Sequence, residues 1–230
     1  MSVDYSARRQ ALRHLLVEQS VEALLVSDLI NIRYLTGFTG SNAALLVHAD
    51  DTATSEKRTV VCTDGRYVEQ IATQVPDLRA EIDRASAGRL LDIARGEALG
   101  YESHVVTVDA HRRFVELFDG ELVRTPGVVE ELRMVKDEHE VELLRSACGV
   151  ADLALADLIV AEGIRVGRTE RAVARELEFL MLERGADGIA FETIVATGAN
   201  SAIPHHRPTD AVMASGDFVK FDFGAMVAGY

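Results

Sequence analysis

Apolar residues in the first half of the chain follow two alternating patterns, one typical of helices and one of buried strands. Leu12, Leu15 and Leu16 stand three and four residues apart, which predicts an amphipathic helix. Short unbroken apolar runs, such as 23–26, predict strands that are buried on both faces. The pattern predicts helices at 7–19, 66–75, 87–99 and 110–118, strands at 23–26, 43–47, 59–62 and 104–108, and loops at 31–42 and 50–58. Such alternation of strand and helix is typical of a layered α/β domain.

The second half of the chain reads differently, with two long amphipathic helices followed by strands. Asp137 and Glu140 have the spacing of a capping box, which marks the start of the first helix. We predict helices at 137–162 and 169–184 and strands at 191–196 and 218–223. The apolar stripe predicted on the first helix consists of Val141, Leu144, Cys148, Ala151, Leu155 and Leu158. Helices followed by strands indicate an α+β domain.

A Pro-Gly turn separates the two patterns. Pro126 and Gly127 lie between patterned segments, and this dipeptide is a strong turn signal. We therefore expect one domain at residues 1–126 and a second at residues 127–230.

Composition and charge narrow the class of protein. Of the 230 residues, 48% are hydrophobic and 27% are charged, as in ordinary globular proteins, and no apolar run reaches the roughly 18 residues that cross a membrane. The formal net charge of −13 argues against a nucleic-acid partner. The N-terminus lacks the basic and apolar regions of a signal peptide, so we expect a cytoplasmic protein. Cys62 and Cys148 lie in apolar patterns and are predicted to be buried free thiols.

The candidate chemistry lies near the end of the chain. Residues 218–223 alternate, so that Asp222 falls opposite an apolar face, and a carboxylate buried in part needs a cation or a metal as its partner. His205 precedes Asp222 by 17 residues (222 − 205), across a segment rich in turn residues, so it can fold back over the strand together with His206. The residue types alone also allow a solvent-facing aspartate and a solvated histidine pair.

Several common catalytic motifs are excluded. The Asp-Phe-Gly sequence at 222–224 lacks the accompanying catalytic and glycine-rich loops of protein kinases. Glu140 follows His139, but Leu143 stands where a zinc-binding His-Glu-x-x-His motif has its second histidine. Neither a Walker loop nor a Gly-x-Ser-x-Gly elbow occurs.

Five segments in order resemble the aminopeptidase P, prolidase and creatinase family, the pita-bread metallopeptidases. Two resemble signatures of the family's N-terminal domain, one resembles the entry to its catalytic domain, and two resemble the first half of its active site. The segments are NIRYLTGFTGS at 31–41, TDGRY at 63–67, LRMVKDEHE at 132–140, TIVATGANSAIPH at 193–205 and VKFDFG at 219–224. The resemblance implies an α/β creatinase-like N-terminal domain followed by an α+β pita-bread domain.

The resemblance also implies roles for individual residues. Asp222 matches the first of five ligands to two divalent ions, often manganese, cobalt or zinc. His205 matches the family's active-site histidine, which hydrogen-bonds the substrate near the scissile peptide, and His206 matches its neighbour in substrate binding. The implied reaction is metal-dependent hydrolysis of the bond before a proline in peptides, in which the ions activate a water and polarise the carbonyl. A homodimer is implied as well.

The sequence ends at Tyr230, and in the family pattern the four remaining metal ligands would come after this position. We therefore expect a truncated form whose pita-bread domain is incomplete and which is itself inactive, the Xaa-Pro aminopeptidase or dipeptidase activity belonging to a longer parent protein. Two alternatives stay open: a creatinase-like hydrolase that uses the histidine without a metal, and a non-catalytic member that binds peptides.

Overall fold

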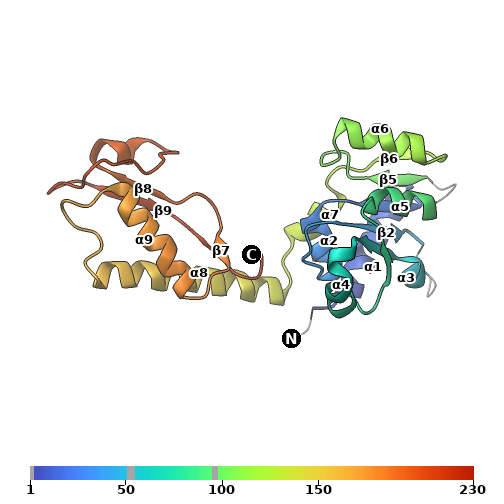
Figure 1. Ribbon diagram of the computed structural model, residues 1–230, viewed down its shortest axis with the longest axis horizontal. Coiled ribbons are helices and arrows are strands. Elements are labelled where there is room, and N and C mark those ends of the chain that lie inside the picture. The colour runs from blue at the N-terminus through green and yellow to red at the C-terminus, as the bar shows by residue number, and fades with distance from the viewer. Residues whose placement is uncertain (1–2, 51–54, 95–97) are drawn as a thin grey trace. The chain divides into compact units, whose positions relative to one another are not determined.

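The structure, a computed structural model, describes residues 3–50, 55–94 and 98–230 (Figure 1). The chain divides into two compact units, residues 1–135 and residues 136–230, which are considered separately below. This division lies beyond the boundary predicted at residue 126. Helix α7 (Val128–Met134) follows that predicted boundary, and its Val128 and Val129 are buried in a core of the first unit.

The first unit is built on one mixed six-stranded sheet. Its strands are β1 (Ala23–Val26), β2 (Ala43–His48), β3 (Val60–Thr63), β4 (Arg79–Ile82), β5 (Leu99–Tyr101) and β6 (Leu122–Arg124). Their order in the sheet is β4-β3-β2-β1-β5-β6. The pairs β1–β2 and β2–β3 are antiparallel, whereas the outer pairs are parallel. Every residue of β1, β2 and β3 is buried, as the unbroken apolar runs predict.

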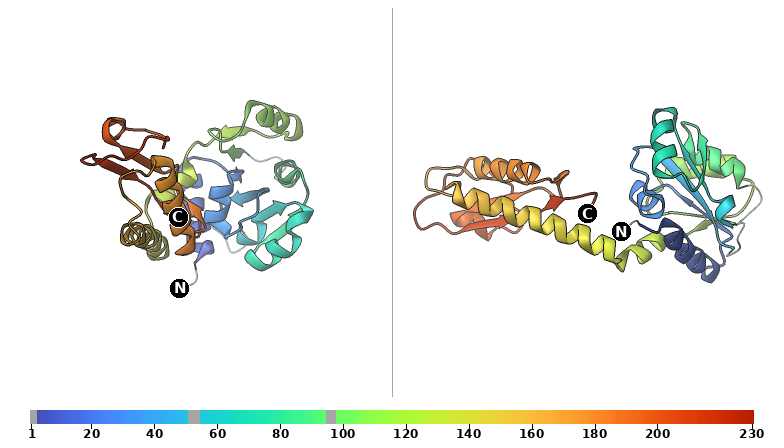
Figure 2. Two further views of the ribbon diagram at one scale, coloured as in Figure 1. Left: turned by 60° about the vertical axis from the view of Figure 1, so that its left-hand side comes forward. Right: turned by 90° about the horizontal axis from the view of Figure 1, so that it is seen from below.

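Helices cover both faces of this sheet (Figures 1 and 2). The helical segments of the first unit, besides α7, are α1 (Tyr5–Glu18), α2 (Leu29–Thr36), α3 (Ser55–Arg58), the 3₁₀ turn η1 (Gly65–Tyr67), α4 (Val68–Gln74), α5 (Ser86–Ile93) and α6 (Val108–Leu117). Successive strand residues alternate between two cores: Leu24 packs with α1, α2, α4 and α7, and Leu25 packs with α5 and α6. The predicted layered α/β domain is confirmed.

The prediction of a loop at 31–42 is wrong for its first part, because α2 occupies residues 29–36. The Asp28 carboxylate caps this helix by accepting hydrogen bonds from the N–H groups of Ile30 and Asn31, at 2.7 and 3.1 Å. Gly37, at a φ of 83°, ends it in the left-handed conformation. Both glycines of the segment, Gly37 and Gly40, thus follow a short helix.

Three other predictions also need correction. Helix α5 ends at Ile93, and Leu99 begins β5, so the helix predicted at 87–99 is too long; residues 95–97 of that prediction lie outside the described residues. The strand predicted at 104–108 is absent from the described chain. There a turn closed by Val105 N–H and the Glu102 carbonyl leads into α6, which Thr107 caps. In the loop predicted at 50–58, residues 51–54 lie outside the described residues, and the last four form α3.

The second unit packs two helices against short antiparallel strand pairs. Its elements are α8 (Glu138–Val160), α9 (Glu170–Glu183), β7 (Gly188–Ile189), β8 (Ile194–Thr197), the 3₁₀ turn η2 (Gly198–Ala202), β9 (Val219–Asp222) and β10 (Ala225–Met226). Figure 2 shows α8 and α9 side by side. Strand β8 pairs with β9 and β7 with β10. The predicted capping box is confirmed, with Asp137 accepting from Glu140 N–H at 2.8 Å and Glu140 from Asp137 N–H at 3.0 Å.

The apolar stripe predicted on α8 is correct only in its second half. Ala151 and Leu158 are buried in the core that α8 shares with α9. Val141 and Leu144 are each 39% exposed, and Cys148 is exposed, so the prediction that it is buried is wrong. Cys62 is buried on β3, as predicted. In the described ranges, no helix has both the length and the apolar character needed to cross a bilayer.

Candidate active site

The strand pair β8–β9 forms the floor of the candidate site. Ile194 of β8 lies directly opposite Asp222 of β9 in the antiparallel register. Val219 and Phe221 pack against the core below α8 and α9, which places Lys220 and Asp222 on the other face. The predicted alternation is therefore confirmed. Asp222 is exposed in the described chain, however, rather than buried in part.

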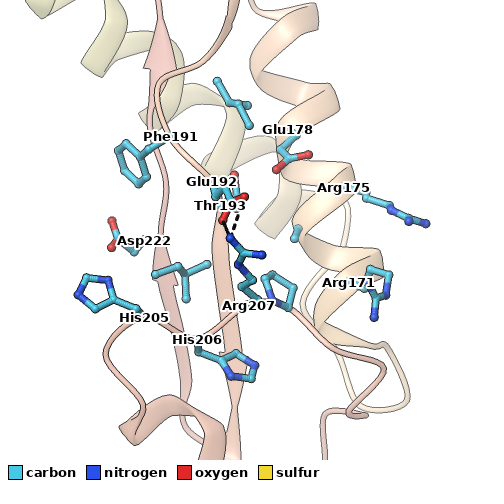
Figure 3. Close-up of a pocket in the computed structure, with 14 residues that line it drawn as sticks. Arg171, Arg175, Glu178, Phe191, Glu192, Thr193, His205, His206, Arg207 and Asp222 are labelled. Atoms are coloured by element: carbon cyan, nitrogen blue, oxygen red, sulfur yellow. Dashed lines mark hydrogen bonds and ion pairs between the residues drawn. The ribbon is translucent and has the colours of Figure 1, made fainter. Parts of the chain in front are cut away.

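A hollow of about 750 Å³ opens beside this strand pair (Figure 3). Its walls come from α9, from the segment leading into β8, from the loop that follows η2, and from the end of β9. The lining residues include His205, His206, Asp222, Phe191, Glu178 and Arg175. Figure 3 shows His205 and Asp222 on one side of the hollow and the α9 side chains on the other. The loop between β8 and β9 thus brings the three predicted site residues to one cavity.

His206 is buried and is held by a carboxylate that the sequence analysis did not identify. Its Nε2 lies 2.8 Å from Oε2 of Glu170, the first residue of α9. Glu170 has no exposed surface. Thr197 N–H and Asn200 Nδ2 donate to its Oε1 at 2.8 and 3.0 Å, and the N–H and hydroxyl of Thr209 donate to its Oε2 at 2.8 and 2.7 Å. Glu170 therefore joins both ends of the loop that bears His205 to the start of α9.

Five donors around one buried carboxylate fix its charge. Burial by itself would raise the pKa of Glu170, but the hydrogen bonds from His206, Thr197, Asn200 and Thr209 outweigh burial and lower the pKa to about 2. The group is consequently ionised at neutral pH. A signal for it exists in the sequence, since an acidic residue directly after the N-cap Thr169 is favoured by the helix dipole. That signal gives no hint that the carboxylate binds a loop 36 residues away.

Lys220 holds the middle of the same loop from the side of β9. Its ammonium group donates to the carbonyl oxygen of Ile203 and to that of Pro204, the latter at 3.2 Å. These carbonyls directly precede His205. Lys220 and Asp222 stand two residues apart on the same face of β9, so one strand bears both the candidate metal ligand and a tether for the candidate catalytic loop.

The described residues offer an incomplete donor set for a metal ion. Asp222 and His205 bring one carboxylate and one imidazole to the hollow. Within residues 3–50, 55–94 and 98–230, no group of three or more His, Cys, Asp or Glu side chains is placed to hold a metal. One carboxylate and one imidazole are too few for a stable divalent site, so these residues alone do not fit such an ion.

The first unit contains its own buried polar cluster. Glu102 accepts hydrogen bonds from the backbone N–H groups of Ser27 and Asp28 and from the Asn31 amide, at 2.6 to 2.8 Å. Burial raises the pKa of Glu102 although these donors oppose the shift. Asn31 also donates to Glu130 of α7 at 2.8 Å. The cluster ties α2 and α7 together at the end of β5, and we assign it a structural part in the first unit.

Comparisons with known proteins follow the division into two units. The sequence matches the model of the creatinase/prolidase N-terminal domain over residues 8–135 and that of metallopeptidase family M24 over residues 142–230. The chain is 33% identical over 227 residues to the uncharacterized peptidase YqhT of Bacillus subtilis, a match that covers 96% of this chain and 62% of that protein.

Solved structures of related peptidases are similar to the whole chain or to its first unit. The Xaa-Pro dipeptidase from Bacillus anthracis is similar with a TM-score of 0.90 and 31% identity, over 99% of this chain and 62% of that one. The N-terminal domain of the cytoplasmic peptidase PepQ from Mycobacterium tuberculosis is 47% identical, with a TM-score of 0.51, over 55% of this chain and 98% of that one. The chain thus spans 62% of the length of the two Bacillus relatives.

Proposed function

The chain belongs to the family that joins a creatinase/prolidase N-terminal domain to an M24 metallopeptidase domain, and from this premise we propose that it takes part in hydrolysis of the peptide bond before a proline. Membership confirms the family resemblance and the predicted fold class, an α/β domain followed by part of a pita-bread domain. The observation that carries the proposal is the convergence of His205 and Asp222 on one hollow. The B. anthracis relative, named as an Xaa-Pro dipeptidase, supports the substrate class.

Each site residue has a role in the proposal. Asp222, an exposed carboxylate at the end of β9, contributes one ligand to a divalent metal centre of the kind that M24 membership implies. His205 hydrogen-bonds the substrate beside the scissile peptide, since an imidazole has ring nitrogens that can donate or accept a hydrogen bond. His206, held by Glu170, forms the buried wall of the substrate site.

In this proposal, the metal centre also needs ligands from residues of the parent protein that are not part of this 230-residue sequence. Asp222 provides one ligand, and the remaining carboxylate and imidazole donors come from further sequence in the parent protein, consistent with relatives that are longer than this chain. The 230 residues by themselves are then inactive towards Xaa-Pro peptides. Manganese, cobalt and zinc all accept such donors.

The first experiment uses the parent protein isolated from its natural source, whose intact mass is measured first. This unaltered protein is then compared with its Asp222→Asn variant. Asp152→Asn, an exposed aspartate on α8, is the matched control. We expect Asp222→Asn to abolish hydrolysis of an Xaa-Pro dipeptide with added Mn²⁺ and to lower the bound metal measured by mass spectrometry, while Asp152→Asn changes neither. Full activity and metal content in Asp222→Asn would refute the role given to this residue. Metal-independent turnover of creatine would instead favour the creatinase-like alternative.

Location and assembly are further parts of the proposal. We propose that the protein is cytoplasmic. The mycobacterial relative is named a cytoplasmic peptidase, which supports this location. We also propose a homodimer, on the basis of the family resemblance. Cell fractionation and light scattering test these two points separately, and a monomer at micromolar concentration would refute the second.

A further inference from the structure

We propose that Lys220 is a positioning residue for His205, holding the backbone before this histidine over the strand that bears Asp222. The inference rests on the proposed function, because it gives the position of His205 a catalytic purpose. Two contacts define it: the Lys220 ammonium donates to the Ile203 and Pro204 carbonyl oxygens. Hydrogen bonds from a charged donor are roughly twice as strong as those between neutral groups.

Lys220 holds the loop directly before His205, whereas Glu170 holds it near its two ends and at His206, directly after His205. Glu170 binds Thr197 and Thr209, near the two ends of the loop. Inside the loop, Ile203 N–H bonds to the Asn200 carbonyl and closes η2. Pro204 has no N–H, so its backbone can be held only through its carbonyl, and Lys220 binds that carbonyl.

His205 itself depends on its backbone for its position. The imidazole is exposed, and in the described part of the chain its ring makes no hydrogen bond with another residue. The Pro204 carbonyl and the His205 Cα belong to one planar peptide unit, so displacement of that carbonyl moves the backbone of His205. Loss of the Lys220 ammonium should therefore displace His205 relative to Asp222 without altering either side chain. A misplacement of about 1 Å in a catalytic group is enough to cost ~100-fold in rate.

The test uses three variants. Lys220→Met keeps the length of the side chain and removes the ammonium, whereas Lys220→Arg keeps a charged donor. Lys57→Met, which changes an exposed lysine of the first unit, is the matched control. Lys220 is half-buried on the outer face of β9, so its replacement leaves the core of the second unit in place.

Hydrogen exchange of residues 198–206 measures the tether without any assay of activity. We expect exchange to be about tenfold faster in Lys220→Met, the effect of losing one charged hydrogen-bond donor, and unchanged in Lys220→Arg and Lys57→Met. Unaltered exchange in Lys220→Met would overturn the inference. In the parent protein, we expect Lys220→Met to lower kcat for an Xaa-Pro dipeptide at least tenfold with KM within twofold, and Lys220→Arg to restore most of it.

Two further outcomes separate the possible failures. If Lys220→Met raises KM for peptides with a free carboxyl terminus and not for their amides, Lys220 binds substrate and the positioning role is overturned. If the unaltered parent protein hydrolyses no Xaa-Pro peptide, the proposed function fails, while the exchange measurement still decides whether Lys220 holds the loop.

Discussion

Replacement of Glu170 by glutamine removes the charge on which the candidate site is built. The pKa of this carboxyl is lowered from an ordinary value of 4.5 to about 2 in the folded chain, so ionised Glu170 stabilises the second unit. A lowering of the pKa from 4.5 to about 2 corresponds to about 3 kcal/mol at pH 7, since a tenfold change in an equilibrium constant is worth about 1.4 kcal/mol. Because the folded pKa is the lower one, this stability is present above pH 4.5 and is lost as the pH falls towards 2.

The assay must report on the second unit by itself, because a chain with two compact units need not unfold in a single two-state transition. Met181 and Met213 are buried in the core of the second unit, at 0% and 3% exposure, so their ¹³C-methyl NMR signals provide such a probe. Urea unfolding followed by these signals should show Glu170→Gln to be less stable than the unaltered chain by about 3 kcal/mol at pH 7 and by about 1 kcal/mol at pH 3. Glu183→Gln, an exposed glutamate of the same helix, should change stability by less than about 0.5 kcal/mol at either pH.

Two results would refute this reasoning. Equal stability of Glu170→Gln and the unaltered chain at pH 7 would mean that the hydrogen bonds to Glu170 do not favour its ionised form. A loss that is the same at pH 7 and pH 3 would mean that packing, not charge, accounts for the role of the residue.

Three further predictions concern stability and exposure. Asp137→Ala removes the N-cap of α8 and should lower the free energy of unfolding by about 1 kcal/mol, measured with the same methionine signals; an unchanged value would contradict the capping geometry. Leu177→Ala, at 0% exposure, should cost about 2–5 kcal/mol, and a loss below 1 kcal/mol would show that the core around α9 is loosely packed. A thiol reagent should modify exposed Cys148 at least ~100-fold faster than Cys62, whose pKa burial raises; equal rates would contradict their placement.

Local patterns predicted those parts of the fold in which neighbouring residues determine the structure. Strand β1 lies at the predicted residues 23–26, because an unbroken apolar run suits a strand that is covered on both faces. The apolar pattern does not identify helix α2 because the helix has only eight residues, too few for a clear helical period, and its ends are set by the Asp28 cap and the Gly37 stop. The stripe on α8 was overextended because helical periodicity does not show how far along a helix its core partners reach.

The residues that line the candidate site could be predicted from the sequence, but the residues that hold its loop in place could not. Turn residues before the Asp222 strand indicated that His205 could fold back, and both residues line one hollow. Glu170 and Lys220 escaped prediction because each acts on backbone groups distant in sequence, which no spacing rule encodes. Their types, an acidic residue at a helix start and a lysine in a strand, are common on protein surfaces.

The attachment of the loop through Glu170 bears on how sequences in this region can diverge. The bonds from Thr197 and Thr209 to Glu170 include the backbone N–H of each residue, at 2.8 Å, and a backbone N–H is present whatever side chain stands there, proline excepted. Eleven positions, 198–208, lie between these two anchors (209 − 197 − 1), and among these described residues only Asn200 and His206 contribute side-chain hydrogen bonds to Glu170. We therefore expect that the exposed residues of this segment can be replaced, or transplanted from a relative, without detaching the loop, provided that Glu170, Asn200 and His206 are kept.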